Sequence, residues 1–168
     1  MYQSIHLRKK ETDISHVIKQ VVINLQDLNC TWAIVGSCNL YIRGCLPSAS
    51  DIDIITDHDG AVLIADSLDQ YTKRKLAYSE AENIRSEFFQ AAIGGYDIEV
   101  MSTPENKING RWIRNADWNF NIEHIFCESI LVPVTTLSYE KCINQKIGNW
   151  KRVEEIQRCL MDALVTPC

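Results

Sequence analysis

The sequence lacks the features that mark several classes of protein. No apolar run approaches the roughly 20 residues that a membrane-spanning helix needs, although 46% of the 168 residues are hydrophobic. The stretch 1–13 has no apolar segment after its charges, so we expect no secretory signal peptide. The formal net charge of −5 argues against a broadly basic surface. We therefore expect neither a membrane nor duplex DNA as a partner.

Cysteine and histidine are present but not in metal-binding patterns. The chain has seven cysteines and four histidines, with no CxxC motif and no ligand spacing. An odd number of cysteines without a signal peptide predicts reduced thiols and a cytoplasmic location. Cys38, Cys45, Cys142 and Cys159 have apolar neighbours, and we expect them to be small core residues.

The periodicity of the apolar residues predicts helices alternating with strands. No repeat or low-complexity segment interrupts the chain. The predicted elements are a helix at 13–28 capped by Asp13, a strand at 31–35, a helix ending at Gly44, a strand at 51–57, a helix at about 59–68, a strand and turn within 71–83, a hairpin at 86–102, a loop at 102–112, a strand at 130–134 and helices at 139–147 and 153–164. Because of Pro133, we expect the strand at 130–134 to be an edge strand or a strand end.

This order predicts an α/β (α+β) fold, with a small mixed β-sheet backed by helices. We expect one domain over residues 1–168, with a core at about 10–104. A strand and helices at about 128–165 would complete it.

Two aspartates interrupt the apolar strand "DIDIITD". Side chains alternate along a strand, so Asp51 and Asp53 share one face while Ile52 and Ile54 point into the core. Two close carboxylates repel unless a cation lies between them, and Mg²⁺ suits them. The alternative is an edge strand whose surface charges prevent aggregation.

A second acidic pair follows in "YDIEVM". Asp97 and Glu99 again alternate with apolar residues. If this strand lies beside the first, three carboxylates can hold two metal ions for phosphoryl displacement. The alternative is the solvated face of a hairpin.

Gly36 and Ser37 follow the strand at 31–35 and begin a helix. Backbone N–H groups at such a junction can bind phosphate, and glycine lets the phosphate approach closely. The alternative is a simple strand-to-helix junction with serine as the N-cap.

Together, "IVGS", "DIDI" and "YDIEV" resemble the DNA polymerase β-like nucleotidyltransferase superfamily, in its minimal, small-molecule type. The resemblance implies Mg²⁺-dependent transfer of a nucleoside monophosphate from a nucleoside triphosphate to a hydroxyl group. It implies that Asp51, Asp53 and Asp97 are catalytic metal ligands, with Glu99 as the rival for the third. It also implies nucleotide binding, ATP included, by Gly36, Ser37 and, from the late helical segment, Lys146.

The acceptor and the oligomeric state stay open. A small molecule or a protein is favoured over RNA as the acceptor, because the charge is negative and no large second domain is present. A homodimer could supply the second wall of the cleft. The alternative function is a catalytically inactive nucleotide-binding or protein-interaction module. Metal-dependent phosphoester hydrolysis is a third hypothesis.

Other polar residues have ordinary structural roles as their first interpretation. Lys73 and Lys146 are expected on solvated faces, and Arg43 is expected to face solvent or pair with an acid. Trp118 and Phe120 could stack a base or fold onto the core.

Overall fold

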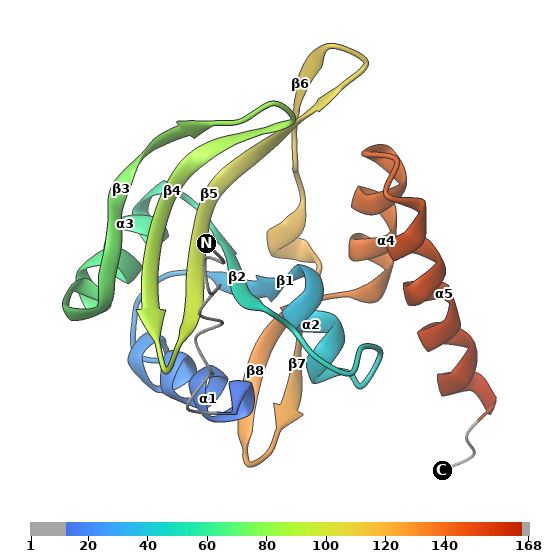
Figure 1. Ribbon diagram of the computed structural model, residues 1–168, viewed down its shortest axis with the longest axis horizontal. Coiled ribbons are helices and arrows are strands. Elements are labelled where there is room, and N and C mark those ends of the chain that lie inside the picture. Colours follow the sequence, from blue (N-terminus) through green and yellow to red (C-terminus); the bar gives the residue numbers. More distant parts are fainter. Residues whose placement is uncertain (1–12, 166–168) are drawn as a thin grey trace, which may run out of the picture.

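The computed structural model describes residues 13–165 and shows a curved mixed sheet with helices on both faces (Figure 1). The expectation that there is no signal peptide concerns residues 1–13, and of these only Asp13 is among the described residues. The helices are α1 (Ile14–Leu25), α2 (Gly36–Ile42), α3 (His58–Ser67), α4 (Leu137–Lys146) and α5 (Trp150–Val165). The strands are β1 (Trp32–Val35), β2 (Asp51–Thr56), β3 (Thr72–Glu80), β4 (Ile84–Ile93), β5 (Tyr96–Ile108), β6 (Arg111–Arg114), β7 (Ile122–Cys127) and β8 (Ile130–Thr135). Of the helices in this range, none is long and apolar enough to cross a membrane.

The sheet places β2 in its interior. The strand order is β3-β4-β5-β2-β1-β8-β7, with β6 paired to β5. Strand β2 runs antiparallel to β1 and parallel to β5. The predicted mixed sheet is therefore confirmed, and the alternative that Asp51 and Asp53 lie on an edge strand is wrong.

The two faces of the sheet have different partners. Helices α1 and α3 cover one face, where Ile52, Ile54 and Ile98 join the main core. On the other face, Ile55 packs with Tyr139 of α4 in a smaller cluster. Because neighbouring side chains alternate, Asp51 and Asp53 lie on the α4 side. Helix α5 packs beside α4 (Figure 1).

Local signals correctly predicted the first elements. Asp13 caps α1, its side chain accepting a hydrogen bond from the Ser15 N–H at 2.9 Å. The predicted hairpin is β4–β5, and both Gly94 and Gly95 have positive φ in its turn (+58° and +84°).

The loop expected at 102–112 is instead strand. Strand β5 continues to Ile108, turns at Asn109 and Gly110, and pairs with β6. Its burial keeps alternating through Ser102, Pro104 and Asn106. These polar or proline positions indicated a loop, but contacts across the sheet bury them.

The edge position expected for the proline-containing strand is also wrong. Strand β8 lies between β1 and β7. Its register with β1 joins Val134 to Ile34, one residue past Pro133, while Pro133 lies opposite His124 of β7. The sheet thus continues on both sides of β8 although Pro133 has no N–H to donate.

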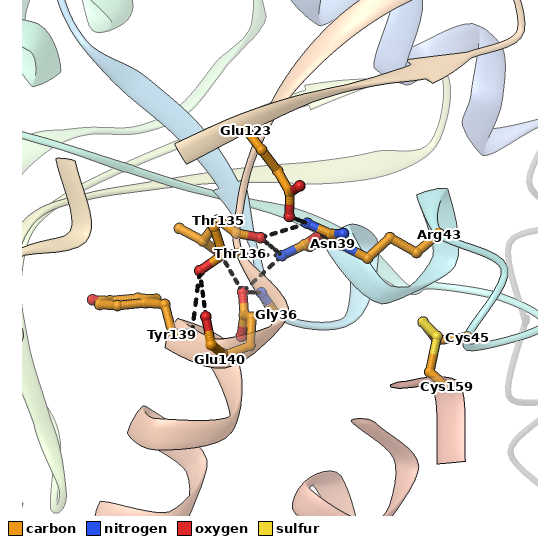
Figure 2. A network of polar contacts seen from close by, with 11 residues as sticks. Gly36, Asn39, Arg43, Cys45, Glu123, Thr135, Thr136, Tyr139, Glu140 and Cys159 are labelled. Carbon is orange, nitrogen blue, oxygen red and sulfur yellow. Dashed lines mark hydrogen bonds and ion pairs between the residues drawn. A yellow bond between two sulfur atoms is a disulfide. The ribbon is translucent and has the colours of Figure 1, made fainter. Parts of the chain in front are cut away.

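The expectation of reduced thiols is wrong for two cysteines. Cys45, in the loop after α2, forms a disulfide with Cys159 of α5, with 5.2 Å between the Cα atoms (Figure 2). The bridge joins positions 114 residues apart, so no local spacing could indicate it. Cys38 is buried as expected, whereas Cys142 is exposed on α4 because it lies on the outer side of that helix.

Candidate active site

The two acidic pairs lie side by side. In the parallel register of β2 with β5, Asp51 is opposite Asp97 and Asp53 is opposite Glu99. Residues opposite each other in register project from the same face. The expected neighbouring placement of the two strands is therefore confirmed, and four carboxylates occupy one patch of the α4 face.

The turn at Gly36 abuts this patch. Gly36 has a φ of +68°, and a Cβ added there would lie 3.1 Å from Asp53 Oδ2. Any larger residue would be strained and crowded, which explains the glycine. The Ser37 hydroxyl donates a hydrogen bond to Asp51 Oδ1 at 3.5 Å. The N-cap of α2 is Val35, without a side-chain bond, so Ser37 is not the N-cap.

Burial and the charges of neighbouring acids raise the pKa of two of these acids, Asp53 and Glu99. The pKa of Asp53 rises from 3.8 to about 7, mainly because the side chain is buried and then because Asp51, Glu99 and Glu140 are close. The pKa of Glu99 is also raised, by burial first and then by Asp51 and Asp97. The patch therefore holds more negative charge than its surroundings neutralise.

Lysine and amide groups meet part of this charge. Lys73 Nζ lies 2.5 Å from Asp97 Oδ1, so Lys73 is not simply solvated, and Gln90 Nε2 donates to Glu99 Oε1 at 3.0 Å. Within residues 13–165, no three acidic, histidine or cysteine side chains converge closely enough to form a metal cluster as they stand. The donor set nevertheless fits a hard divalent cation, which prefers carboxylate oxygens. In the structure, the Lys73 ammonium supplies positive charge next to Asp97, at the edge of this set of carboxylates.

The raised pKa of Asp53 predicts a pH-dependent stability. Between about pH 4 and pH 7 the folded state keeps a proton on Asp53 that the unfolded state has lost. Folding therefore binds protons, and the Asp53 contribution to the free energy of unfolding falls as pH rises through this window. Urea unfolding without divalent metal should show that the stability of the wild type, relative to Asp53→Asn, is lower at pH 7.5 than at pH 5. A difference that is constant with pH would contradict the assignment.

A cavity of about 260 Å³ opens between the sheet and α4. Asp53 and Gly36 lie in its wall, together with Ile55, Met101 and Ile143. Its lining combines apolar side chains with polar ones, among them Asn106, Asn115 and Asn144, so it suits a ring-sized group that has both an apolar surface and polar atoms.

Other predicted residues do not line this cavity. Lys146 is exposed in the last turn of α4 and does not line the cavity. Arg43 pairs with Glu123 at 2.6 Å, in agreement with the expected acid partner. Trp118 is buried and Phe120 is 83% exposed, so the tryptophan folds onto the core.

The sequence reasoning missed Glu140. This side chain is buried on α4, lines the cavity and accepts a hydrogen bond from the Gly36 N–H at 2.9 Å (Figure 2). The only sequence signal was an acidic residue in the first turn of a helix, which normally indicates a favourable interaction with the helix dipole.

Comparisons with solved structures support the fold. A protein of Thermotoga maritima assigned to the nucleotidyltransferases superposes with a TM-score of 0.75 at 24% identity, covering 94% of this chain and 99% of that one. ANT(2'')-Ia in complex with adenylyl-2''-tobramycin gives 0.60 at 10% identity, covering 90% of each chain. The lincosamide antibiotic adenylyltransferase LnuA, bound to lincomycin, gives 0.55 at 9% identity, covering 89% and 98%.

Sequence comparison gives one distant and one extensive match. Acyl-coenzyme A oxidase 2 of Yarrowia lipolytica is 27% identical over 99 residues, which are 59% of this chain but only 13% of that protein. The family match covers residues 17–159, from α1 to α5. With the nucleotidyltransferase fold and the acidic patch beside Gly36, this match shows that the chain belongs to the aminoglycoside-2''-adenylyltransferase family and is a nucleotidyltransferase.

Proposed function

We propose that this chain is a Mg²⁺-dependent adenylyltransferase that moves AMP from ATP to a hydroxyl group of a small molecule and releases pyrophosphate. The main observation that supports this proposal is the register of β2 with β5, which aligns four acids beside Gly36. The family supports adenylyl as the transferred group. Two related structures contain adenylyl-2''-tobramycin and lincomycin, which supports a small-molecule acceptor over a protein.

Each acid has a proposed role. Asp51 and Asp53 would hold two Mg²⁺ ions, with Asp97 as the third carboxylate. When bound, magnesium supplies positive charge that neutralises the reacting phosphates. Asp97 takes the proton of the acceptor hydroxyl, whose oxygen bonds to the α-phosphorus as the bond to pyrophosphate breaks.

The remaining groups position the substrates. The Gly36–Ser37 turn borders the phosphates, and Lys146 is a candidate for the outer ones. The cavity beside Asp53, with its apolar and asparagine side chains, would accommodate part of a substrate. A homodimer and a cytoplasmic location stay predictions, and the disulfide removes the support that reduced cysteines gave to the latter.

The direct test uses ATP labelled at the α-phosphate. Purified protein with Mg²⁺ is incubated with tobramycin, with lincomycin, or with a cell lysate. Label in a small molecule, with equimolar pyrophosphate, supports the proposal. Label in RNA or protein would identify another acceptor, and Mg²⁺-dependent binding of ATP without transfer would favour the inactive binding module.

The choice of Asp97 over Glu99 gives a separate prediction. Lys73 already places a positive charge on Asp97, whereas Glu99 is held by Gln90. We therefore expect Asp97→Asn to lower kcat by roughly 10²–10³-fold. Losses of this size are usual when a group that interacts with charge developing in the transition state is removed. Glu99→Gln, a matched change one pair further along β5, should cost about tenfold or less. The reverse order, measured as initial rates over a Mg²⁺ titration, would make Glu99 the third ligand.

A further inference from the structure

The carboxylate of Glu140 is buried in a polar network between three elements. Its exposed fraction is 5%. Its Oε1 atom accepts hydrogen bonds from Gly36 N at 2.9 Å, Asn39 Nδ2 at 3.0 Å and Thr135 Oγ1 at 2.6 Å (Figure 2). Burying a carboxylate is costly unless donors compensate it. Three donors on one oxygen therefore fix this side chain in place.

The network extends away from the acids through Arg43. Asn39 Nδ2 also donates to the Thr135 carbonyl at 2.8 Å, and Arg43 Nε donates to Asn39 Oδ1 at 2.8 Å. Arg43 Nη2 reaches the same Thr135 carbonyl at 2.8 Å. Helix α2, strand β8 and helix α4 are thus joined through Glu140 and its neighbours.

On the other side, Glu140 is linked to the acids through one backbone group as well as through its charge, which acts on Asp53. The bond to Gly36 N fixes the peptide that connects Val35 to Gly36, where β1 ends and α2 begins. Gly36 in turn lies close to Asp53, because a Cβ atom added to Gly36 would be only 3.1 Å from Asp53 Oδ2. A shift at Glu140 therefore reaches Asp53 after a single intervening residue.

We propose that Glu140 is a positioning residue for nucleotide binding, which holds the Gly36–Ser37 turn in the conformation that receives the phosphates. This rests on the proposed function. The opposite possibility is that the carboxylate occupies the Gly36 N–H in place of a phosphate and must leave. Asn39 and Thr135 hold Glu140 independently of Gly36, so displacement would break two further hydrogen bonds. The two possibilities predict opposite changes in nucleotide affinity.

The test compares Glu140→Gln with Glu140→Ala in the full chain, using MgATP as the probe. In Glu140→Gln, the amide oxygen can accept the same hydrogen bonds as Oε1 does in the wild type. These bonds become neutral instead of charged, which weakens them only modestly. We therefore expect the Kd of this variant for MgATP to stay within about threefold of wild type. Alanine removes the acceptor, and we expect the Kd to rise by roughly 10-fold or more, since bonds to charged groups contribute most. Kd is measured by calorimetry well below the melting temperature of each variant.

Two further variants guard against simple misfolding. Thr135→Val removes one of the three donors and should weaken MgATP binding in the same direction. Glu155→Gln removes an ion pair with Arg152 within α5 and should leave the Kd unchanged. A purely structural role would lower the melting temperature of Glu140→Ala without changing its Kd, which would overturn the proposal.

The remaining outcomes are also decisive. Tighter MgATP binding by Glu140→Gln or Glu140→Ala would mean that the carboxylate occupies the phosphate position, and it would overturn the positioning role. Failure of the wild type itself to bind MgATP would instead reject the proposed function.

Discussion

Asp53→Asn is expected to lower kcat for nucleotidyl transfer by at least about 10³-fold, because the variant loses a charged oxygen at the point where phosphate charge must be neutralised. Asp53 lies opposite Glu99, near Asp51 and against Gly36. Asp51 instead lies opposite Asp97 and accepts a hydrogen bond from Ser37, so it is Asp53 that faces both Glu99 and Gly36. Its loss should therefore not be compensated by a neighbour.

The asparagine variant keeps the shape of the side chain. It removes a buried negative charge among three other carboxylates, so the metal-free variant should fold at least as well as the wild type near neutral pH. Transfer of α-labelled phosphate to the acceptor found for the wild type is the measurement. Asp66→Asn, an exposed change on α3, is the matched control and should retain full activity. More than a tenth of wild-type kcat in Asp53→Asn would remove Asp53 from the proposed metal ligands.

Loss of the Cys45–Cys159 disulfide is expected to lower the free energy of unfolding by about 2–5 kcal/mol. The bridge closes a loop with a sequence separation of 114, and a long loop gives a large entropic effect on the unfolded chain. Total stabilities of about 5–15 kcal/mol are usual. Cys45→Ser should therefore remove a substantial part of the total and lower the melting temperature by roughly 5–15 °C.

The control for this prediction is Cys142→Ser, which changes an exposed free thiol on α4. Urea unfolding without reductant should separate the two variants, whereas added dithiothreitol should bring the wild type close to Cys45→Ser. Alkylation of Cys45 and Cys159 in the unreduced folded protein, or equal stability of the two serine variants, would contradict the bridge.

Elements with local signals were predictable from the sequence. Asp13 before an amphipathic run indicated α1, and Gly94-Gly95 between alternating residues indicated the β4–β5 turn. The motif around Asp51 also predicted which side chains share a face, since that depends only on the alternation along one strand.

Features set by distant contacts were not predictable. Asn106 is buried because β5 lies in a sheet, yet its local sequence resembles a loop. Glu140 meets Gly36 across 104 positions, and Cys45 meets Cys159 across a similar distance. No periodicity or spacing encodes such pairs. They depend on how α4 and α5 pack against the rest of the fold.

The bridge from the loop after α2 to α5 makes a covalent ring of the chain between its two sulfur atoms. Strands β2 and β5, and all four acids of the patch, belong to that ring, whereas Gly36 and Ser37 lie on the tail outside it. A single proteolytic cut within the ring would leave both pieces attached to one another. A cut between Ser37 and Cys45 would break the covalent link between the turn and the acids, so the integrity of the site depends on the backbone just before the ring.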